Sequence, residues 1–124
     1  MGKKSKRIMS ELYIIKEPIT KAELKKIAEE RFGDLVKGVV DIEQRIMALG
    51  GEFHMDEANF LHEQRQSKSD NVWGINLYPD KSGEDMLEFD SVINIKSNLG
   101  NRTRGIDDLK IQGKIREIVG KLIK

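Results

Sequence analysis

The sequence predicts a single α+β domain in the order β-α-β-(α)-β-β-α, with a mostly antiparallel sheet of about four strands and two main helices packed on one face. Two segments have apolar residues at helical spacing, and others alternate apolar with polar residues. Turn-forming residues separate these segments. The chain of 124 residues has the length of one domain, with 11–124 as the folded part and 1–10 as a flexible basic tail.

Composition and charge exclude several classes of protein. Apolar residues make up 38% of the chain and charged residues 35%, which is too apolar for a disordered protein and too polar for a membrane protein. The absence of cysteine excludes disulfides, thiolate metal sites and a cysteine nucleophile. The first residues are basic but no apolar core follows them, so we expect no secretory signal and a cytoplasmic protein.

The net charge of +1 is unevenly distributed along the chain. Four basic residues lie within the tail, and without them the folded part is mildly acidic: Lys3, Lys4, Lys6 and Arg7. A globally basic nucleic-acid-binding domain is therefore not indicated.

The first predicted elements are a short strand and a helix. Leu12–Lys16 is rich in β-forming residues and is ended by Pro18. Thr20 and Glu23 form a capping box, followed by apolar residues at helical spacing. These signals predict a helix over residues 21–31.

The next segment changes to a period of two. Apolar and polar residues alternate over Val36–Leu49, which predicts one long strand with Asp41 and Glu43 on its solvent face. The pair Gly50-Gly51 permits a bend, after which Glu52–Asp56 is expected to continue the strand.

The central and C-terminal parts contain a hairpin and a last helix. Asp56 is expected to cap a short helix, and 64–71 is expected to form a polar loop. Residues 73–78 and 87–95 alternate on either side of a segment rich in turn formers, which predicts a hairpin. Asp107 or Asp108 then caps a helix whose apolar stripe is Ile111, Ile115, Ile118, Val119 and Leu122.

Six runs along the chain together resemble a prokaryotic family of uncharacterised small proteins, a domain of unknown function. They are I-I-K-E-P-I at 14–19, V-V-D-I-E at 39–43, A-L-G-G-E-F-H at 48–54, W-G-I-N-L-Y-P at 73–79, E-F-D-S-V-I-N-I at 88–95 and G-N-R-T-R-G-I at 100–106. The resemblance covers about residues 12–123 and implies no activity, cofactor or site residue. Proteins of this kind begin near the first strand, so the tail is a departure from the pattern.

The first candidate site is a glycine-flanked loop before the last helix. Such a loop can present backbone N–H groups to an anion, and arginines add bidentate phosphate donors. Tyr78 is the better candidate for stacking, because Trp73 shares a face with apolar neighbours and is expected in the core. Alternatively, the arginines pair with Asp90 or Glu88 and the loop has only a structural role. The other candidate ligand-binding residues are Asn98, Asn101, Arg102 and Arg104.

The second candidate is a metal site formed by Glu52, His54 and Asp56. In an extended strand these residues share one face, and two carboxylates with an imidazole are a known ligand set for metals. The alternative is a solvated polar edge beside the bend.

Three hypotheses of function follow from these candidates. The leading one is a small binding module for a phosphate-bearing ligand such as RNA or a nucleotide. The second is a metal-dependent hydrolase that uses Glu52, His54 and Asp56. The third is an obligate partner in a homodimer or larger complex that pairs through an open strand edge. No particular cofactor is indicated.

Overall fold

The computed structural model describes residues 12–124 and consists of a five-stranded sheet with three α-helices. Its helices and strands are β1 (Tyr13–Ile15), α2 (Lys21–Glu29), β2 (Val36–Asp41), β3 (Ile46–Leu49), α3 (His54–Arg65), β4 (Val72–Leu77), β5 (Leu87–Glu88) and α4 (Leu109–Leu122). The predicted α+β class is confirmed. The predicted tail at 1–10 lies outside the described residues.

The sheet has the order β1-β3-β2-β4-β5, and every pair of neighbouring strands is antiparallel. It contains five strands where about four were predicted. The extra strand arises because Val36–Leu49, predicted as one long strand, is a hairpin of β2 and β3.

A turn at residues 42–45 connects the two strands of this hairpin, and the side chain of Asp41 stabilises the turn. The Oδ1 atom of Asp41 accepts hydrogen bonds from the backbone N–H groups of Glu43 and Gln44, at 2.9 and 3.0 Å. Arg45 then has a φ of 61°, in the left-handed region. The prediction that Asp41 faces solvent is therefore wrong: it is 1% exposed, because its carboxylate satisfies the backbone of the turn.

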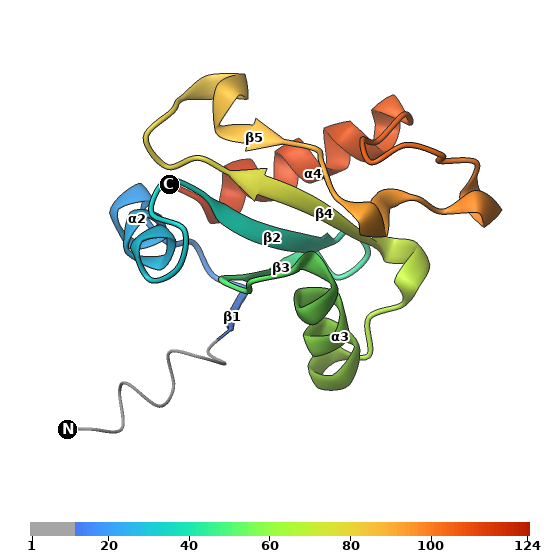
Figure 1. Ribbon diagram of the computed structural model, residues 1–124, viewed down its shortest axis with the longest axis horizontal. Coiled ribbons are helices and arrows are strands. Elements are labelled where there is room, and N and C mark those ends of the chain that lie inside the picture. The colour runs from blue at the N-terminus through green and yellow to red at the C-terminus, as the bar shows by residue number, and fades with distance from the viewer. Residues whose placement is uncertain (1–11) are drawn as a thin grey trace.

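The two main helices, α2 and α4, lie on one face of the sheet, and α3 lies on the opposite face (Figure 1). We call these the α4 face and the α3 face. Apolar residues of both main helices pack on the α4 face against strand residues Val36, Val40, Met47, Leu49, Trp73, Ile75 and Leu77. The α3 face has a smaller apolar cluster of Val39, Ile46, Ala48, Leu61 and Val72.

The signals at the ends of α2 and α4 are confirmed. Thr20 and Glu23 form the predicted capping box, although α2 ends at Glu29 rather than at residue 31. Asp108 is the residue that caps α4, where it accepts a hydrogen bond from the N–H of Lys110. The apolar stripes are buried in part. The helix α2 buries Leu24, Ile27 and Ala28, whereas Phe32, beyond its end, is exposed. The helix α4 buries Ile115, Ile118, Val119 and Leu122, and Ile111 is partly buried.

The helix α3 and the strand β5 depart from the predictions. Residues 52–56 do not continue a strand, since α3 begins at His54 with no side-chain cap, and it runs on to Arg65 into the predicted polar loop. The second strand of the predicted hairpin, 87–95, is paired only at Leu87–Glu88. Beyond it the chain forms a 3₁₀ turn at Val92–Asn94.

No helix within residues 12–124 is long and apolar enough to cross a membrane.

Candidate functional site

A row of polar side chains crosses the α3 face of the sheet. Lys37 of β2 is the cross-strand partner of Asn76 of β4, which is in turn the partner of Glu88 of β5. Because side chains of paired residues stand on the same face, the three lie side by side on neighbouring strands. We call Lys37, Asn76 and Glu88 the polar row.

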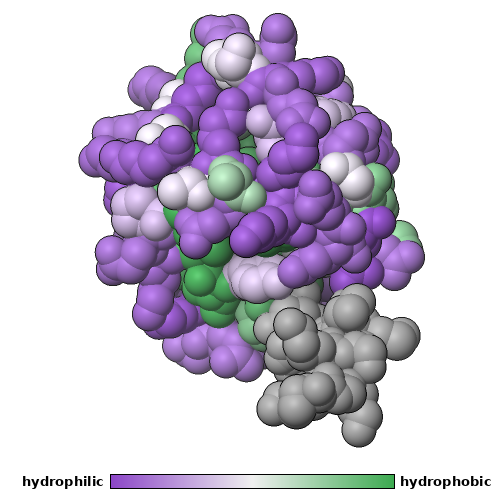
Figure 2. All heavy atoms as spheres, turned by 90° about the vertical axis from the view of Figure 1, so that its left-hand side faces the viewer, coloured by the Kyte–Doolittle hydropathy of each residue, from purple (hydrophilic) through white to green (hydrophobic). Residues whose placement is uncertain are grey.

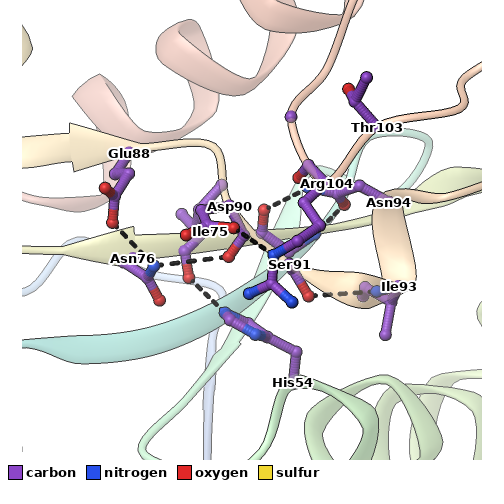
Figure 3. Close-up of polar contacts among 12 residues, drawn as sticks. His54, Ile75, Asn76, Glu88, Asp90, Ser91, Ile93, Asn94, Thr103 and Arg104 are labelled. Carbon is purple, nitrogen blue, oxygen red and sulfur yellow. Dashed lines mark hydrogen bonds and ion pairs between the residues drawn. The ribbon is translucent and has the colours of Figure 1, made fainter.

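Asn76 is the central residue of this row, and it is only 8% exposed. Its Nδ2 atom donates to Glu88 Oε1 at 2.9 Å and to the carbonyl oxygen of Asp90 at 3.4 Å (Figure 3). Its Oδ1 atom is buried and accepts no hydrogen bond from any residue of the described part. A buried acceptor without a donor is costly, so this oxygen favours a donor supplied from outside the chain.

His54, the first residue of α3, points at the sheet beside Asn76 (Figure 3). Its Nε2 atom lies 2.8 Å from the carbonyl oxygen of Ile75. A carbonyl only accepts, so Nε2 carries the hydrogen and Nδ1 is the basic nitrogen. Burial lowers the pKa of His54; the Ile75 carbonyl and the Asn76 side chain act against this shift, and Lys37 adds to it. At neutral pH the imidazole is therefore uncharged.

Glu57 lies one helical turn further along α3 and is completely buried. Its Oε2 atom accepts a hydrogen bond from the N–H of Gly51 at 2.7 Å, whereas Oε1 has no partner within residues 12–124. Burial raises the pKa of Glu57 well above its ordinary value, although Lys37 and Arg31 oppose this. Burial therefore shifts the equilibrium of Glu57 toward the protonated acid.

Two exposed phenyl rings flank the lysine of the polar row. The Nζ atom of Lys37 lies 5.2 Å from the ring centre of Phe32 and 5.6 Å from that of Phe53. The two phenylalanines are 40% and 56% exposed. Hydrophilic side chains cover most of the side of the molecule that carries α2 (Figure 2). A cation between two accessible rings can bind a ligand that is both aromatic and anionic.

Hydrogen bonds extend the polar row to two of the predicted ligand-binding residues. The hydroxyl of Tyr78 donates to Glu88 Oε1 at 2.9 Å. At the other end, Arg104 Nε donates to Asp90 Oδ1 at 2.7 Å (Figure 3). The alternative that an arginine pairs with Asp90 is thus confirmed for Arg104. Its Nη1 and Nη2 groups make no hydrogen bond to a described residue, so the pair orients the guanidinium without using all of its donors.

The other predicted ligand-binding residues are not gathered at this site. Asn101 is buried, and its Nδ2 donates to the carbonyls of Asn94, Thr103 and Gly105. Its amide shapes the loop and is unavailable to a ligand. Asn98 donates to Asp70 before β4, and Arg102 is exposed.

Asn94 holds the segment after β5 against β4, a role that the sequence analysis missed. Its Oδ1 accepts from the N–H of Gly74 at 2.7 Å, and its Nδ2 donates to the carbonyls of Gly74 and Arg104 at 3.0 and 2.9 Å. The side-chain amide thus replaces the backbone of a paired strand. Gly74 is needed there because a Cβ would lie 2.4 Å from the Cβ of Ser91.

The predicted metal site lacks the geometry on which it depends. Because α3 begins at His54, the three residues do not lie along one strand. Glu52 and Asp56 are exposed, whereas His54 is buried against Ile75. Within residues 12–124, no three acidic or histidine side chains form a group that can hold a metal ion.

Segments far apart in the sequence therefore meet on the α3 face. Four of the runs that carry the family resemblance contribute polar or aromatic residues to the site: 48–54, 73–79, 88–95 and 100–106. Lys37 and Phe32 lie outside those runs.

Comparison with known proteins gives a family but no activity. A family model described as a protein of unknown function, DUF5674, matches residues 13–122. No curated protein and no solved structure matches the chain.

Proposed function

Because the chain belongs to the DUF5674 family, whose function is unknown, we propose a function from its own side chains: the α3 face binds a ribonucleotide, free or within a single-stranded RNA. The observation that carries this proposal is the Lys37 ammonium between two exposed phenyl rings, next to the buried and unpaired Oδ1 of Asn76. This arrangement offers a surface for stacking, a positive charge and a hydrogen-bond acceptor within one small area.

The aromatic rings supply the sequence-independent part of binding. A base that stacks on Phe53 or Phe32 is held by its π-face, which every base has. Lys37 lies within 6 Å of both ring centres, so a phosphate attached to a stacked nucleoside is within reach of its ammonium. Binding of this kind weakens as salt rises, because the phosphate charge is screened.

Arg104 of the 100–106 segment supplies a further phosphate donor. Arg104 is oriented by Asp90 through Nε, which leaves its terminal nitrogens for a phosphate oxygen. Of the residues predicted to bind phosphate, this keeps Arg104, and Lys37 supplies the main positive charge.

Asn76 supplies a contact that depends on the ligand. Its Oδ1 is buried, so the side chains that cover it must move before it can accept from an exocyclic amino group or from a ribose 2′-hydroxyl. Since Nδ2 is held by Glu88 and by the Asp90 carbonyl, the amide cannot turn over without losing both bonds. The contact therefore favours a ligand group that donates.

Fluorescence anisotropy with a labelled, short mixed-sequence RNA tests the proposal. We expect Phe53→Ala to weaken binding by about tenfold, the cost of losing one stacked base. The matched control is Leu109→Ala, which removes an exposed apolar side chain at the start of α4. Lys37→Gln is expected to weaken binding and to make it less dependent on salt. The control Lys114→Gln removes a positive charge on α4, far from the site, and is expected to change affinity and salt dependence only slightly.

Equal affinities for Phe53→Ala and Leu109→Ala would contradict the proposal, as would binding that does not respond to salt.

The expectation that the protein forms a homodimer or joins a complex stays a prediction. Size-exclusion chromatography with light scattering measures its oligomeric state.

A further inference from the structure

A second concave site lies between α3 and the segment at 92–96, above the first residue of β4. It is a pocket of about 330 Å³. Met55 and Ala58 of α3 form one wall, Val92 and Ile95 form the other, and Val72 lies at its base. None of the three residues of the polar row lines this pocket, so the two sites are separate.

The walls of this pocket leave apolar surface open to solvent. Met55, Val92 and Ile95 are 53%, 59% and 48% exposed. Large apolar side chains that remain half exposed around one hollow are typical of a surface that binds something. The volume is at the lower end of the range for ligand pockets, which corresponds to a small molecule rather than a folded partner.

The polar end of the pocket carries a lysine without a carboxylate partner. The Nζ atom of Lys96 donates to the carbonyl oxygen of Ser69 at 2.7 Å, and it forms no ion pair with an acidic residue of the described part. Burial lowers the pKa of Lys96, and the charge of Asp70 only partly opposes this. A half-buried ammonium that has a carbonyl and an aromatic ring beside it but no carboxylate gains from an anionic ligand, because the ligand compensates for the lost hydration.

His62 adds a second polar group at the rim. Its Nδ1 atom lies 3.0 Å from the carbonyl oxygen of Ser67, so Nδ1 carries the hydrogen in this contact. The remaining nitrogen, Nε2, can accept a hydrogen bond from a ligand or a bridging water. The pocket thus combines apolar walls with polar groups at one end.

We propose that this pocket binds a small amphipathic carboxylate, with its apolar body between Met55 and Val92 and its carboxylate on the ammonium of Lys96. The proposal stands apart from the ribonucleotide site, since it uses different residues and a ligand without a base.

Trp73 makes this proposal measurable in the unmodified protein. It is the only tryptophan of the chain, and its ring centre lies 5.1 Å from Nζ of Lys96. A carboxylate that pairs with Lys96 changes the charge beside the indole and therefore its emission.

The experiment titrates the full chain with octanoate, using 1-octanol as the matched uncharged probe. Backbone-amide NMR gives the affinity, and Trp73 emission reports the charge. We expect the chemical shifts of Ala58, Val72 and 92–96 to change and reach a plateau as octanoate is added. The affinity for 1-octanol is expected to be lower by at least about tenfold. Shifts that never saturate, or equal affinity for both probes, would overturn the proposal.

Substitutions distinguish the contribution of the Lys96 charge to binding from that of the apolar walls. Lys96→Met is expected to weaken octanoate binding by about tenfold while leaving 1-octanol unchanged, and Lys68→Met, outside the pocket, is the control. Ala58→Leu narrows the groove without touching Lys96 and is expected to weaken both probes. If Lys96→Met binds octanoate as tightly as the unmodified protein, the lysine is not the anion site and the proposal fails.

Discussion

The two faces of the same sheet are built in different ways. On the α4 face, apolar side chains from four strands pack against two capped amphipathic helices. On the α3 face, the apolar cluster is smaller, and buried polar side chains take the remaining positions: Asp41, His54, Glu57, Asn76 and Asn94. The α4 face is held mainly by apolar packing, whereas the α3 face depends more on specific hydrogen bonds. A face that buries five polar groups is expensive to build, which favours a function for it.

The largest effect is expected on the α4 face. Ile115→Ala removes a completely buried side chain of α4 and should lower the free energy of unfolding by about 2–5 kcal/mol. The affinity for RNA should stay unchanged in the folded fraction. Urea denaturation followed by circular dichroism measures the stability. If the fully folded variant binds RNA with a different affinity, the claim that the two faces act separately is contradicted.

On the α3 face, the corresponding test is Asn94→Ala. This change removes two hydrogen bonds with Gly74 and one with the Arg104 carbonyl, all from a completely buried amide. We expect a loss of stability of about 2–3 kcal/mol, since buried backbone groups lose their partners. Because the segment carrying Arg104 is also released, RNA affinity should fall as well. A stability loss without any loss of affinity would show that this segment does not contribute to binding.

Glu57 gives the α3 face a pH dependence. Burial raises its folded-state pKa above the ordinary value of 4.5, so the folded state binds the proton more tightly than the unfolded state. Its stabilising contribution is therefore present at low pH and is lost as pH rises from about 4.5 through the raised pKa, with a slope of up to about 1.4 kcal/mol per pH unit. Glu57→Gln should remove this slope. If the free energies of unfolding of the two proteins change in parallel between about pH 5 and about pH 8, the predicted role of Glu57 is contradicted.

The smallest effect is expected at the end of α3. Gln66 follows the helix with a φ of 56°, a conformation that favours glycine. Gln66→Gly should raise the free energy of unfolding by about 0.5–1 kcal/mol, because it relieves the strain at an exposed position. Thermal unfolding of the two proteins measures this, and a lower midpoint for the variant would show that the glutamine has another role.

The sequence predicted the α4 face well because each of its signals is local. The capping box at Thr20, the Asp108 cap and the alternation of Trp73, Ile75 and Leu77 all reappear in the structure. Apolar periodicity reports burial directly, so it identifies elements that are stabilised by packing.

The α3 face was predicted poorly because its signals are pairwise. Asp41 looked like a solvent-facing residue, but it holds a turn within Val36–Leu49. Asn94 lies in a run that alternates like a strand, yet its side chain takes the place of backbone pairing with Gly74. His54 and Glu57 carry no helical cap signal before them. No periodicity reveals such partners, which are distant in the chain.

Only part of the candidate site was predicted, because most of its contacts join residues that are distant in the sequence. Tyr78 and Arg104 were predicted from their residue types, and the structure joins them through Glu88, Asn76 and Asp90. Lys37 was missed because a single lysine in a strand gives no periodic signal, and Phe53 because exposed aromatic rings cannot be told from core residues by sequence.

The most direct test of the difference between the faces is a backbone-amide NMR titration of the full chain with a short single-stranded RNA at low salt. The α3 face is predicted to respond, with shifts at Lys37, Phe53, Asn76 and Arg104 that decrease as salt is raised, while α4 stays unchanged. Shifts confined to α4 or to residues 1–11, or no shifts, would contradict the assignment of function to the α3 face.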